Sequence, residues 1–422
     1  MDKLYISGGK PLIGSINIGG MKNAALPIIF ATVLVGDVCV LENLPEVSDI
    51  NTALEMISRM GAKVERLDRG TYRIDTREVR CGSAPLDLAG SMRGSYYVLG
   101  AELGRFGRSA TGLPGGCNFG KRPIDQHIKG FEALGAKVIC SDDAVSCFAE
   151  RPLTGTSVYL DIASVGATVN IMMAATKAQG MTVIDNAARE PHIVDLANFL
   201  NSCGANISGA GTEVIKIRGV SELHGGTYAI IPDMIEAGTY MIAAAATKSK
   251  LTITNVIPRH LEATTAKLIE VGVKVEEGDD YVTVSYEGEL KKARVKTDFY
   301  PGFPTDMNPQ FCVLLCLADG ESVLTESVMD NRFKYTDELA RMGAKISVHG
   351  RDAVVTGVPE LHSANVRAVD LRAGAAMVIA ALAAKGTTVI DDIYHIERGY
   401  EDMVEKLRGV GADIRIVRGD RG

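Results

Sequence analysis

Leu134-Gly135-Ala136-Lys137-Val138 is one of six similar segments that recur along the chain. Each has an apolar residue, a glycine, Ala or Val, a polar residue, and then Val or Ile. The glycines of these segments lie between 68 and 74 residues apart, at Gly61, Gly135, Gly204, Gly272, Gly343 and Gly411. A helix that ends in a glycine C-cap and leads into a strand explains the pattern, so the sequence predicts six repeats.

An alanine-rich helix followed by a strand recurs upstream of these glycines. We expect such strands over residues 182–186, 251–255 and 387–391. The period exceeds the 20 to 50 residues usual for solenoids, so small α/β units are favoured over a linear array. The simplest arrangement is two domains of three repeats, with crossovers near residues 20 and 230. Domain I would then comprise residues 1–20 and 230–422, and domain II residues 21–229.

The first helix of each repeat is predicted to open on polar or small residues, at 20–23, 91–94, 164–167, 232–236, 304–308 and 370–373. Helix N-termini carry unpaired N–H groups and bind anions. Three of these starts also carry a cation, Lys22, Arg93 or Arg372, although a cation is disfavoured there. A bound anion would compensate, which points to one highly charged substrate pocket where the repeats converge.

Structural roles are open for several of these helix starts. Asp233 with Glu236 fits a capping box. Thr305 fits an N-cap, with Asp306 complementing the helix dipole, as well as a chemical site. Ser91 and Ser164 are ordinary N-cap residues.

Composition restricts the class of protein. The chain has 422 residues, 46% of them hydrophobic, and a net charge of −7 without a basic stripe. Two domains are the default at this length, and binding to nucleic acid is not expected. The first residues lack the features of a signal peptide, and the apolar run 373–384 is too short to cross a bilayer. We therefore expect a soluble cytoplasmic protein without membrane insertion; its oligomeric state is left open.

The eight cysteines include no Cys-x-x-Cys pair, so no metal site is predicted. Cys39, Cys140 and Cys203 have apolar neighbours and are predicted to be buried. Cys312 and Cys316 have helical spacing, which favours a shared core face.

Cys117 differs from the other cysteines. It lies in a glycine-rich loop within residues 112–127, and Lys121 and Arg122 follow it closely. Positive charge lowers the pKa of a thiol, so this loop favours a reactive thiolate.

The ordered motifs resemble the UDP-N-acetylglucosamine 1-carboxyvinyltransferase family of enolpyruvyl transferases. The matching segments are residues 22–27, 113–117, 122–125, 164–168, 186–191, 303–307, 326–328, 331–333, 370–373 and 394–400. This resemblance implies an α/β fold of two inside-out domains, each built from three repeated α/β units. It agrees with the repeats counted from the glycines.

The resemblance also implies the reaction. The enolpyruvyl group of phosphoenolpyruvate would move to the 3-hydroxyl of UDP-N-acetylglucosamine with release of phosphate, by addition and then elimination. This is the first committed step of peptidoglycan precursor synthesis. The family uses no cofactor, and dinucleotide, Walker and metal-ligand motifs are absent from the sequence.

Site residues carried over from the family fall into four groups. The first comprises cations for the phosphate and carboxylate of phosphoenolpyruvate, with one adjoining amide: Lys22, Asn23, Arg93, Arg122, Arg332, Arg372 and Arg398. Guanidinium groups suit such bidentate contacts. Asp306 is the expected general base, and Asp370 and Glu190 are acidic neighbours with less defined roles. The uridine and diphosphate contacts are expected at Arg122, Pro123, Ile124, Asp125, Gln126, Ser164, Val165 and Gly166. Val328 would line the sugar pocket through its backbone.

Cys117 occupies the position of the family's loop cysteine. That residue protonates C3 of phosphoenolpyruvate, aids product release, forms an adduct with the substrate and is alkylated by fosfomycin. Which of the first two roles dominates is open, and the resemblance implies fosfomycin sensitivity.

The chain departs from the family pattern at Met21 and Met234, neither of which is assigned to chemistry. Two rival interpretations are weighed. The shikimate-pathway enolpyruvyl transferase lacks the cysteine loop and the uridine segment. A binding paralogue has no need to keep both Cys117 and Asp306.

Overall fold

The computed structural model describes residues 2–82, 84–90, 92–112, 124–142 and 144–419. The chain forms two compact units. Unit 1 comprises Met1–Gly19 and Pro232–Gly422, and unit 2 comprises Gly20–Ile231. Each unit is described by itself.

Unit 2 contains the following elements in chain order: α1 (Lys22–Val35), β3 (Val38–Glu42), α2 (Ser48–Arg59), β4 (Lys63–Asp68), β5 (Thr71–Asp75), α3 (Leu86–Ala89), η1 (Arg93–Tyr96), α4 (Tyr97–Phe106), β6 (Arg108–Gly112), α5 (Asp125–Ala133), β7 (Ala136–Cys140), β8 (Ala144–Ala149), β9 (Ser157–Tyr159), α6 (Val165–Ala175), β10 (Met181–Asp185), α7 (Pro191–Ser202), β11 (Asn206–Ser208), β12 (Val214–Arg218) and β13 (Thr227–Ala229).

Unit 1 contains β1 (Lys3–Ser7), β2 (Ile13–Asn17), α8 (Met234–Ala246), β14 (Lys250–Thr254), η2 (Pro258–Leu261), α9 (Glu262–Glu270), β15 (Val273–Glu277), β16 (Tyr281–Tyr286), β17 (Arg294–Lys296), η3 (Thr305–Met307), α10 (Asn308–Cys316), β18 (Glu321–Thr325), η4 (Arg332–Tyr335), α11 (Thr336–Arg341), β19 (Lys345–His349), β20 (Asp352–Thr356), β21 (Asn365–Arg367), α12 (Leu371–Ala383), β22 (Thr387–Asp391), α13 (Tyr394–Glu397), α14 (Met403–Gly409) and β23 (Asp413–Val417).

Each unit has three small sheets in the described part of the chain. Unit 1 has the strand orders β21-β22-β1-β23, β15-β16-β14-β2 and β17-β18-β20-β19. Unit 2 has β13-β3-β5-β4, β11-β12-β10-β9 and the three-stranded β6-β8-β7. Every four-stranded sheet has one parallel pair at an edge, such as β17 with β18, and antiparallel pairs elsewhere. This recurrence matches the sequence repeats.

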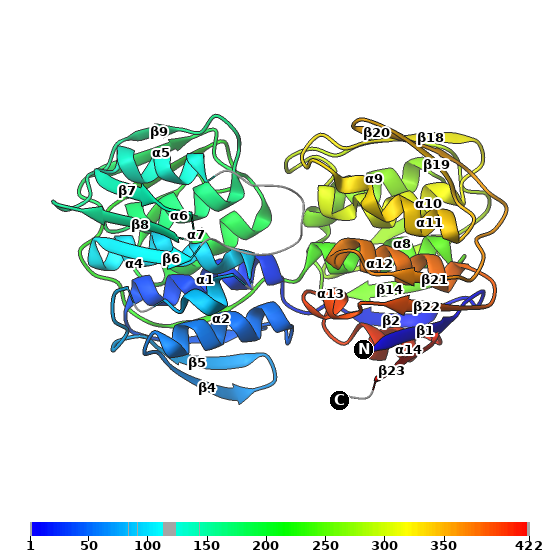
Figure 1. The fold of residues 1–422 in the computed structure, drawn as a ribbon, viewed down its shortest axis with the longest axis horizontal. Coiled ribbons are helices and arrows are strands. Elements are labelled where there is room, and N and C mark those ends of the chain that lie inside the picture. Colours follow the sequence, from blue (N-terminus) through cyan, green and yellow to red (C-terminus); the bar gives the residue numbers. More distant parts are fainter. Residues whose placement is uncertain (1, 83, 91, 113–123, 143, 420–422) are drawn as a thin grey trace. The chain divides into compact units, whose positions relative to one another are not determined.

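The sheets enclose the apolar helices of each unit (Figure 1). In unit 1, α8, α10 and α12 pack against one another, and in unit 2, α4 packs against α1 and α6. Nearly every residue of α1, α6, α8, α10 and α12 is buried, as are six of the ten residues of α4. A helix that is apolar on all sides is stable only when it is enclosed, so helices lie inside and sheets outside. The predicted inside-out α/β fold is confirmed.

The repeat glycines take the predicted C-cap conformation. Their φ angles are 109° at Gly61, 96° at Gly135, 98° at Gly204, 92° at Gly272, 91° at Gly343 and 97° at Gly411. Each follows a helix and precedes a strand, and Gly135 and Gly272 directly adjoin β7 and β15. This left-handed region favours glycine, which explains why the six segments share that residue.

Four predicted helix starts are confirmed at α1, α6, α8 and α12. The other two begin with 3-10 turns, η1 before α4 and η3 before α10. Pro309, near the start of α10, has no N–H, so the preceding turn cannot continue the α-helical bonding pattern. Asp233 caps α8, but the Glu236 carboxylate accepts from Gly19 N–H instead of completing a capping box.

The predictions for the cysteines were mostly right. Cys39, Cys203, Cys312 and Cys316 are buried, but Cys140 is exposed at the end of β7, so its predicted burial was wrong. Among the described residues, no helix combines the length and apolar character needed to span a membrane.

Candidate functional site

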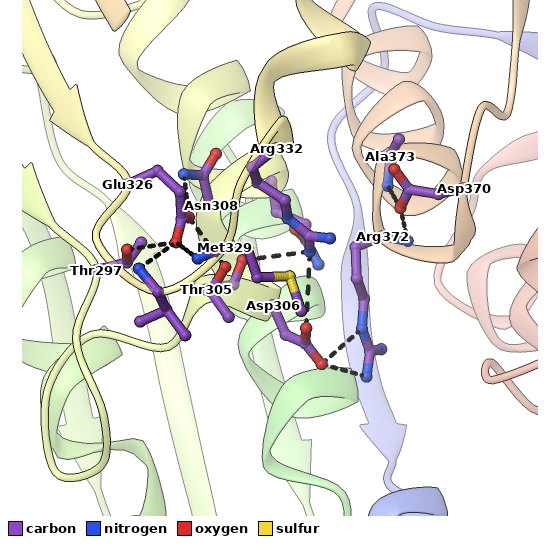
Figure 2. Close-up of polar contacts among 12 residues, drawn as sticks. Thr297, Thr305, Asp306, Asn308, Glu326, Met329, Arg332, Asp370, Arg372 and Ala373 are labelled. Atoms are coloured by element: carbon purple, nitrogen blue, oxygen red, sulfur yellow. Dashed lines mark hydrogen bonds and ion pairs between the residues drawn. The ribbon is translucent and has the colours of Figure 1, made fainter. Parts of the chain in front are cut away.

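Asp306 is the centre of a charged cluster in unit 1 (Figure 2). It lies in η3, and its side chain is 25% exposed. The Nε and Nη2 atoms of Arg372 lie 3.1 and 3.0 Å from Asp306 Oδ2. Arg332 Nη2 lies 3.6 Å from Asp306 Oδ1. One partly open carboxylate therefore faces two buried guanidinium groups.

Arg372 is held by the first turn of α12. Asp370 Oδ1 accepts hydrogen bonds from the backbone N–H groups of Arg372 and Ala373, at 2.8 and 2.9 Å. The guanidinium also lies over the ring of Tyr400, 5.4 Å from its centroid. Asp370 was predicted as an acidic neighbour of the site, and its contacts here are those of an N-cap.

Electrostatics keep Arg372 charged although it is buried. Burial is the largest single influence on the pKa of Arg372 and lowers it, but Asp306, Tyr400 and Asp233 together outweigh burial, so that pKa is raised. Its Nη1 atom is buried and has no hydrogen-bond partner among the described residues. A buried, charged donor of this kind can bind an anion.

Arg332 opens η4 and is 3% exposed. Its Nη2 atom donates to the carbonyl of Thr305 at 3.3 Å, next to Asp306. Thr305 does not cap its helix, because its hydroxyl donates to Glu326 instead. The N-cap alternative for Thr305 is therefore wrong.

Arg398 follows α13, close to His395. Burial lowers the pKa of His395, and the charge of Arg398 lowers it further, whereas Asp370 acts in the opposite direction. Arg398 and Asp370 thus both act on one half-buried imidazole at this end of unit 1.

Val328 lies in the loop between β18 and η4. Its backbone N–H donates to Glu326 Oε1 at 2.9 Å. The carboxylate of Glu326 is buried and also binds the hydroxyl of Thr305. The sequence motif contained Glu326, but no role was predicted for it.

Lys22 begins α1 in unit 2 and is 8% exposed. Its Nζ lies 2.9 Å from Oδ2 of Asp49, which is also buried, in α2. Asn23 follows Lys22 and is partly exposed. Nothing in the sequence indicated the Asp49 partner, because two residues 27 positions apart on different helices share no periodic pattern.

Gln126 joins the start of α5 to the loop after β9. Its Oε1 accepts from the Asp161 N–H at 2.8 Å, and its Nε2 donates to Asp161 Oδ2 at 3.0 Å. Its Nε2 also donates to Asp125. Ile124 precedes α5 as its N-cap residue. The side chains of Asp125 and Gln126 thus contact each other at the start of α5, directly after Ile124.

Ser164, Val165 and Gly166 form the start of α6. The Ser164 hydroxyl caps the helix by accepting from Ala167 N–H at 3.3 Å. A Cβ atom on Gly166 would lie 3.0 Å from the His127 ring, a tight contact that the imidazole would have to shift to relieve. His127 Nδ1 in turn contacts Asn170 Nδ2 at 2.9 Å.

The remaining predicted residues are less defined. Glu190 is the N-cap residue of α7 and is partly exposed, without a side-chain cap bond to that helix. Only the backbone of Arg93 is described, within η1. Cys117, Arg122 and Pro123 lie outside the described residues.

Within the described residues, no group of three or more His, Cys, Asp or Glu side chains is arranged to hold a metal ion. The unit 1 cluster has a different chemistry, with one carboxylate able to take a proton and arginines able to bind anions. The Lys22 side chain adds a buried cation in unit 2.

The chain is similar to known proteins over almost its full length. The family model for EPSP synthase (3-phosphoshikimate 1-carboxyvinyltransferase) matches residues 6–407. UDP-N-acetylglucosamine 1-carboxyvinyltransferase 3 of Caldanaerobacter subterraneus subsp. tengcongensis is 53% identical, over 99% of this chain and 100% of that protein. The UDP-N-acetylglucosamine 1-carboxyvinyltransferase of Clostridium botulinum is 52% identical, over 98% of this chain and 99% of that protein.

Solved structures share the fold. The enolpyruvyl transferase NikO from Streptomyces tendae has a TM-score of 0.89 at 27% identity, covering 99% of both chains. EPSP synthase from Acinetobacter baumannii has a TM-score of 0.79 at 17% identity, covering 99% of this chain and 100% of that one. The family model, the full-length relatives and the fold agree, and the chain belongs to the enolpyruvyl transferase family, among its UDP-N-acetylglucosamine 1-carboxyvinyltransferases.

Proposed function

We propose that this chain transfers the enolpyruvyl group of phosphoenolpyruvate to the 3-hydroxyl of UDP-N-acetylglucosamine and releases phosphate. It is a transferase of peptidoglycan precursor synthesis. Relatives that are 50% to 53% identical over almost their full length carry the name of this reaction. The contact of Asp306 with Arg332 and Arg372 carries the proposal, because it pairs a proton acceptor with anion-binding groups.

Asp306 is the proposed general base. In the addition step, the sugar hydroxyl oxygen bonds to C2 of phosphoenolpyruvate, its proton passes to Asp306, and C3 gains a proton. In the elimination step, C3 loses a proton, the bond from C2 to the phosphate oxygen breaks, and phosphate leaves. A correctly placed general base contributes about 10² to 10⁴ in rate.

Cations stabilise the negative charge of the substrate during both the addition and the elimination step. Arg332, Arg372 and Arg398 are proposed to bind the carboxylate and phosphate of phosphoenolpyruvate from unit 1. The unpartnered Nη1 of Arg372 supports this role, because a buried guanidinium donor gains a charge-assisted bond when an anion arrives. Asp370 supports the same function indirectly by fixing the first turn of α12.

Unit 2 is proposed to supply the remaining contacts. Lys22 and Asn23 would bind the phosphate, with Arg93 and Arg122 contributing further charge. Residues 122–126 would contact uridine, and the capped start of α6 at residues 164–166 would bind the diphosphate. Cys117 would protonate C3 or assist product release, and Glu190 would be an acidic neighbour.

The location of the reaction is also part of the proposal. Both proposed substrates are soluble, highly charged metabolites of the cytoplasm, so we infer that the protein acts there.

A phosphorylated shikimate is the alternative acceptor, because the matching family model carries that description. Two observations favour the nucleotide sugar. The relatives above 50% identity are named for it, whereas the EPSP synthase structure is only 17% identical and shares the fold alone.

The proposed reaction has a defined product. Incubation with phosphoenolpyruvate and UDP-N-acetylglucosamine should give one enolpyruvyl ether and one phosphate per turnover, measured by mass spectrometry and a phosphate assay. Phosphate release without a sugar product would indicate hydrolysis and would reject the proposed transfer.

A further inference from the structure

Glu326 lies directly after β18 and is 1% exposed. Its Oε1 accepts hydrogen bonds from the Thr297 hydroxyl and from the backbone N–H groups of Val328 and Met329, each at 2.9 Å. Its Oε2 accepts from the Thr305 hydroxyl and from Asn308 Nδ2, also at 2.9 Å. Both oxygens of this carboxylate are therefore saturated.

All five donors are neutral, and within the described residues no lysine or arginine forms an ion pair with the Glu326 carboxylate; Arg351 Nη1 donates to the backbone carbonyl of Glu326 instead, at 3.0 Å. Burial of a carboxylate is unfavourable unless hydrogen bonds replace its hydration. The carboxylate of Glu326 keeps all five bonds only while Val328, Met329, Thr297, Thr305 and Asn308 keep their present directions. A buried charge of this kind constrains the geometry of its donors more strongly than a neutral side chain would.

The donors belong to the segments that carry the proposed site (Figure 2). Thr305 precedes Asp306 in η3, and Val328 is the residue proposed to line the sugar pocket. Asn308 opens α10, and its Oδ1 accepts from the Tyr335 hydroxyl at 2.6 Å. Tyr335 ends η4, the turn that begins with Arg332.

We propose that Glu326 is a positioning residue for the transfer reaction, because its one carboxylate joins the segments bearing Asp306, Val328 and Arg332. This inference rests on the proposed function. The N–H of Val328 is taken by Glu326, which leaves the carbonyl as the backbone group that Val328 can offer to the sugar. Glu326 does not touch the reacting atoms; it acts through the residues that do.

The structure suggests a specific substitution, Glu326→Gln. The new amide keeps one oxygen, which can still accept from Val328 and Met329, and turns its NH₂ group toward Thr305 and Asn308. The Thr305 hydroxyl can rotate and accept, but the Asn308 NH₂ group cannot accept while Oδ1 binds Tyr335. E326Q therefore either breaks the contact with Asn308 or keeps it by a flip of the Asn308 amide, which reverses the hydrogen bond to Tyr335; both changes disturb the link to η4.

A second substitution should restore that contact. In N308D the side chain is a carboxylate of the same shape, which can accept both from Tyr335 and from the amide introduced by E326Q. The double variant E326Q/N308D reverses the direction of one hydrogen bond and keeps the buried charge. N308D alone places two buried carboxylates together, which is unfavourable.

The test measures kcat, KM for both substrates and the pH profile of kcat/KM for the wild type, both single variants and the double variant. Rates are expressed per folded molecule, counted by UDP-N-acetylglucosamine binding in calorimetry. We expect E326Q to lower kcat by about tenfold or more, from one lost buried hydrogen bond, and the double variant to recover to within about threefold. The acid limb of the profile should move in E326Q and return in the double variant, because Asp306 is displaced and then restored.

Glu102→Gln is the matched control. Glu102, in α4 of unit 2, is also buried and accepts from the Ser109 hydroxyl at 2.7 Å and from Gly82 N–H at 3.0 Å. E102Q should lower stability while kcat per folded molecule stays within about twofold of the wild type, since no proposed site residue binds Glu102.

Two results would overturn the inference while leaving the proposed function intact. One is an E326Q enzyme with normal kcat and an unchanged pH profile, even if its melting temperature falls. The other is a double variant no more active than E326Q. A wild-type protein without turnover would overturn both proposals.

Discussion

Asp306 shows how far single residues can be predicted. The sequence assigned Asp306, Arg332 and Arg372 to one site, and the structure brings their charged groups together. Asp306 and Arg372 lie at predicted helix starts, whereas Arg332 was assigned only through the family resemblance. No role was predicted for Asp49, which pairs with Lys22, or for Glu326, which binds Val328. Burial and pairing between different elements leave no local signal in a sequence.

Replacement of Asp306 tests the general base. Asp306→Asn keeps the shape and removes the proton acceptor, so kcat should fall by at least ~10². Binding of UDP-N-acetylglucosamine, measured by calorimetry, should change much less. Near-normal turnover would show that Asp306 only complements the helix dipole and the arginines.

The pair of Lys22 and Asp49 predicts an effect of ligand on stability. Asp49→Asn leaves the buried ammonium group without its counter-charge, so the melting temperature should fall. If Lys22 binds the substrate phosphate, phosphoenolpyruvate should raise the melting temperature of D49N by more than that of the wild type. Asp87→Asn, which breaks the exposed pair with Arg59, is the control and should show no extra shift. Equal ligand shifts in D49N and wild type would argue against a phosphate at Lys22.

At the scale of elements, the glycine-closed helices were the most predictable feature, because one conformational requirement selects one residue type. The 3-10 opening at η3 was missed although Pro309 was visible in the sequence. Pro309 has no N–H to bond to the carbonyl four residues earlier, so the turn before it cannot be α-helical. The proline was therefore a signal for this 3-10 turn. Cys140 was misjudged because apolar neighbours along a strand do not reveal which face is covered.

Two glycines in unit 1 provide a matched test of the C-cap argument. Gly411 has φ of 97°, whereas Gly409 is the last residue of α14, and an added Cβ would meet no atom within 4 Å at either. Gly411→Ala should therefore lower the free energy of unfolding by about 1 kcal/mol, and Gly409→Ala should leave it unchanged or raise it by up to about 0.5 kcal/mol. Urea unfolding measures both. Equal effects would show that backbone conformation does not decide the choice of residue.

The link between α7 and β13 predicts a dependence of stability on pH. Burial raises the pKa of Asp195 to about 6, against hydrogen bonds from Tyr228 and Ile231. Because the folded pKa is raised, the contribution of Asp195 is fully present below pH ~4 and is lost as pH rises through 6. The cost of ionising Asp195 should reach about 3 kcal/mol at neutral pH.

Comparison of wild type with Asp195→Asn isolates this effect. The asparagine can still accept from the Tyr228 hydroxyl, which lies 2.6 Å from Asp195 Oδ1. The stability difference between the two proteins, from urea unfolding, should shift in favour of D195N between pH 4 and 7. A difference that stays constant over this range would mean that Asp195 titrates normally.

At the scale of the whole molecule, the six repeats predicted small α/β units, and the family resemblance implied the inside-out fold; the two units share their sheet pattern and central helices. The fold alone does not select the acceptor, because the EPSP synthase structure shares it at 17% identity. The proposed function assigns the choice between a nucleotide sugar and a phosphorylated shikimate to residues in loops and helix starts.

A comparison of acceptors tests this central claim most directly. Phosphate release is measured with phosphoenolpyruvate and either UDP-N-acetylglucosamine or shikimate 3-phosphate, at equal concentrations. We predict steady release with UDP-N-acetylglucosamine and none above background with shikimate 3-phosphate. Release with shikimate 3-phosphate alone, or with neither acceptor, would contradict the account.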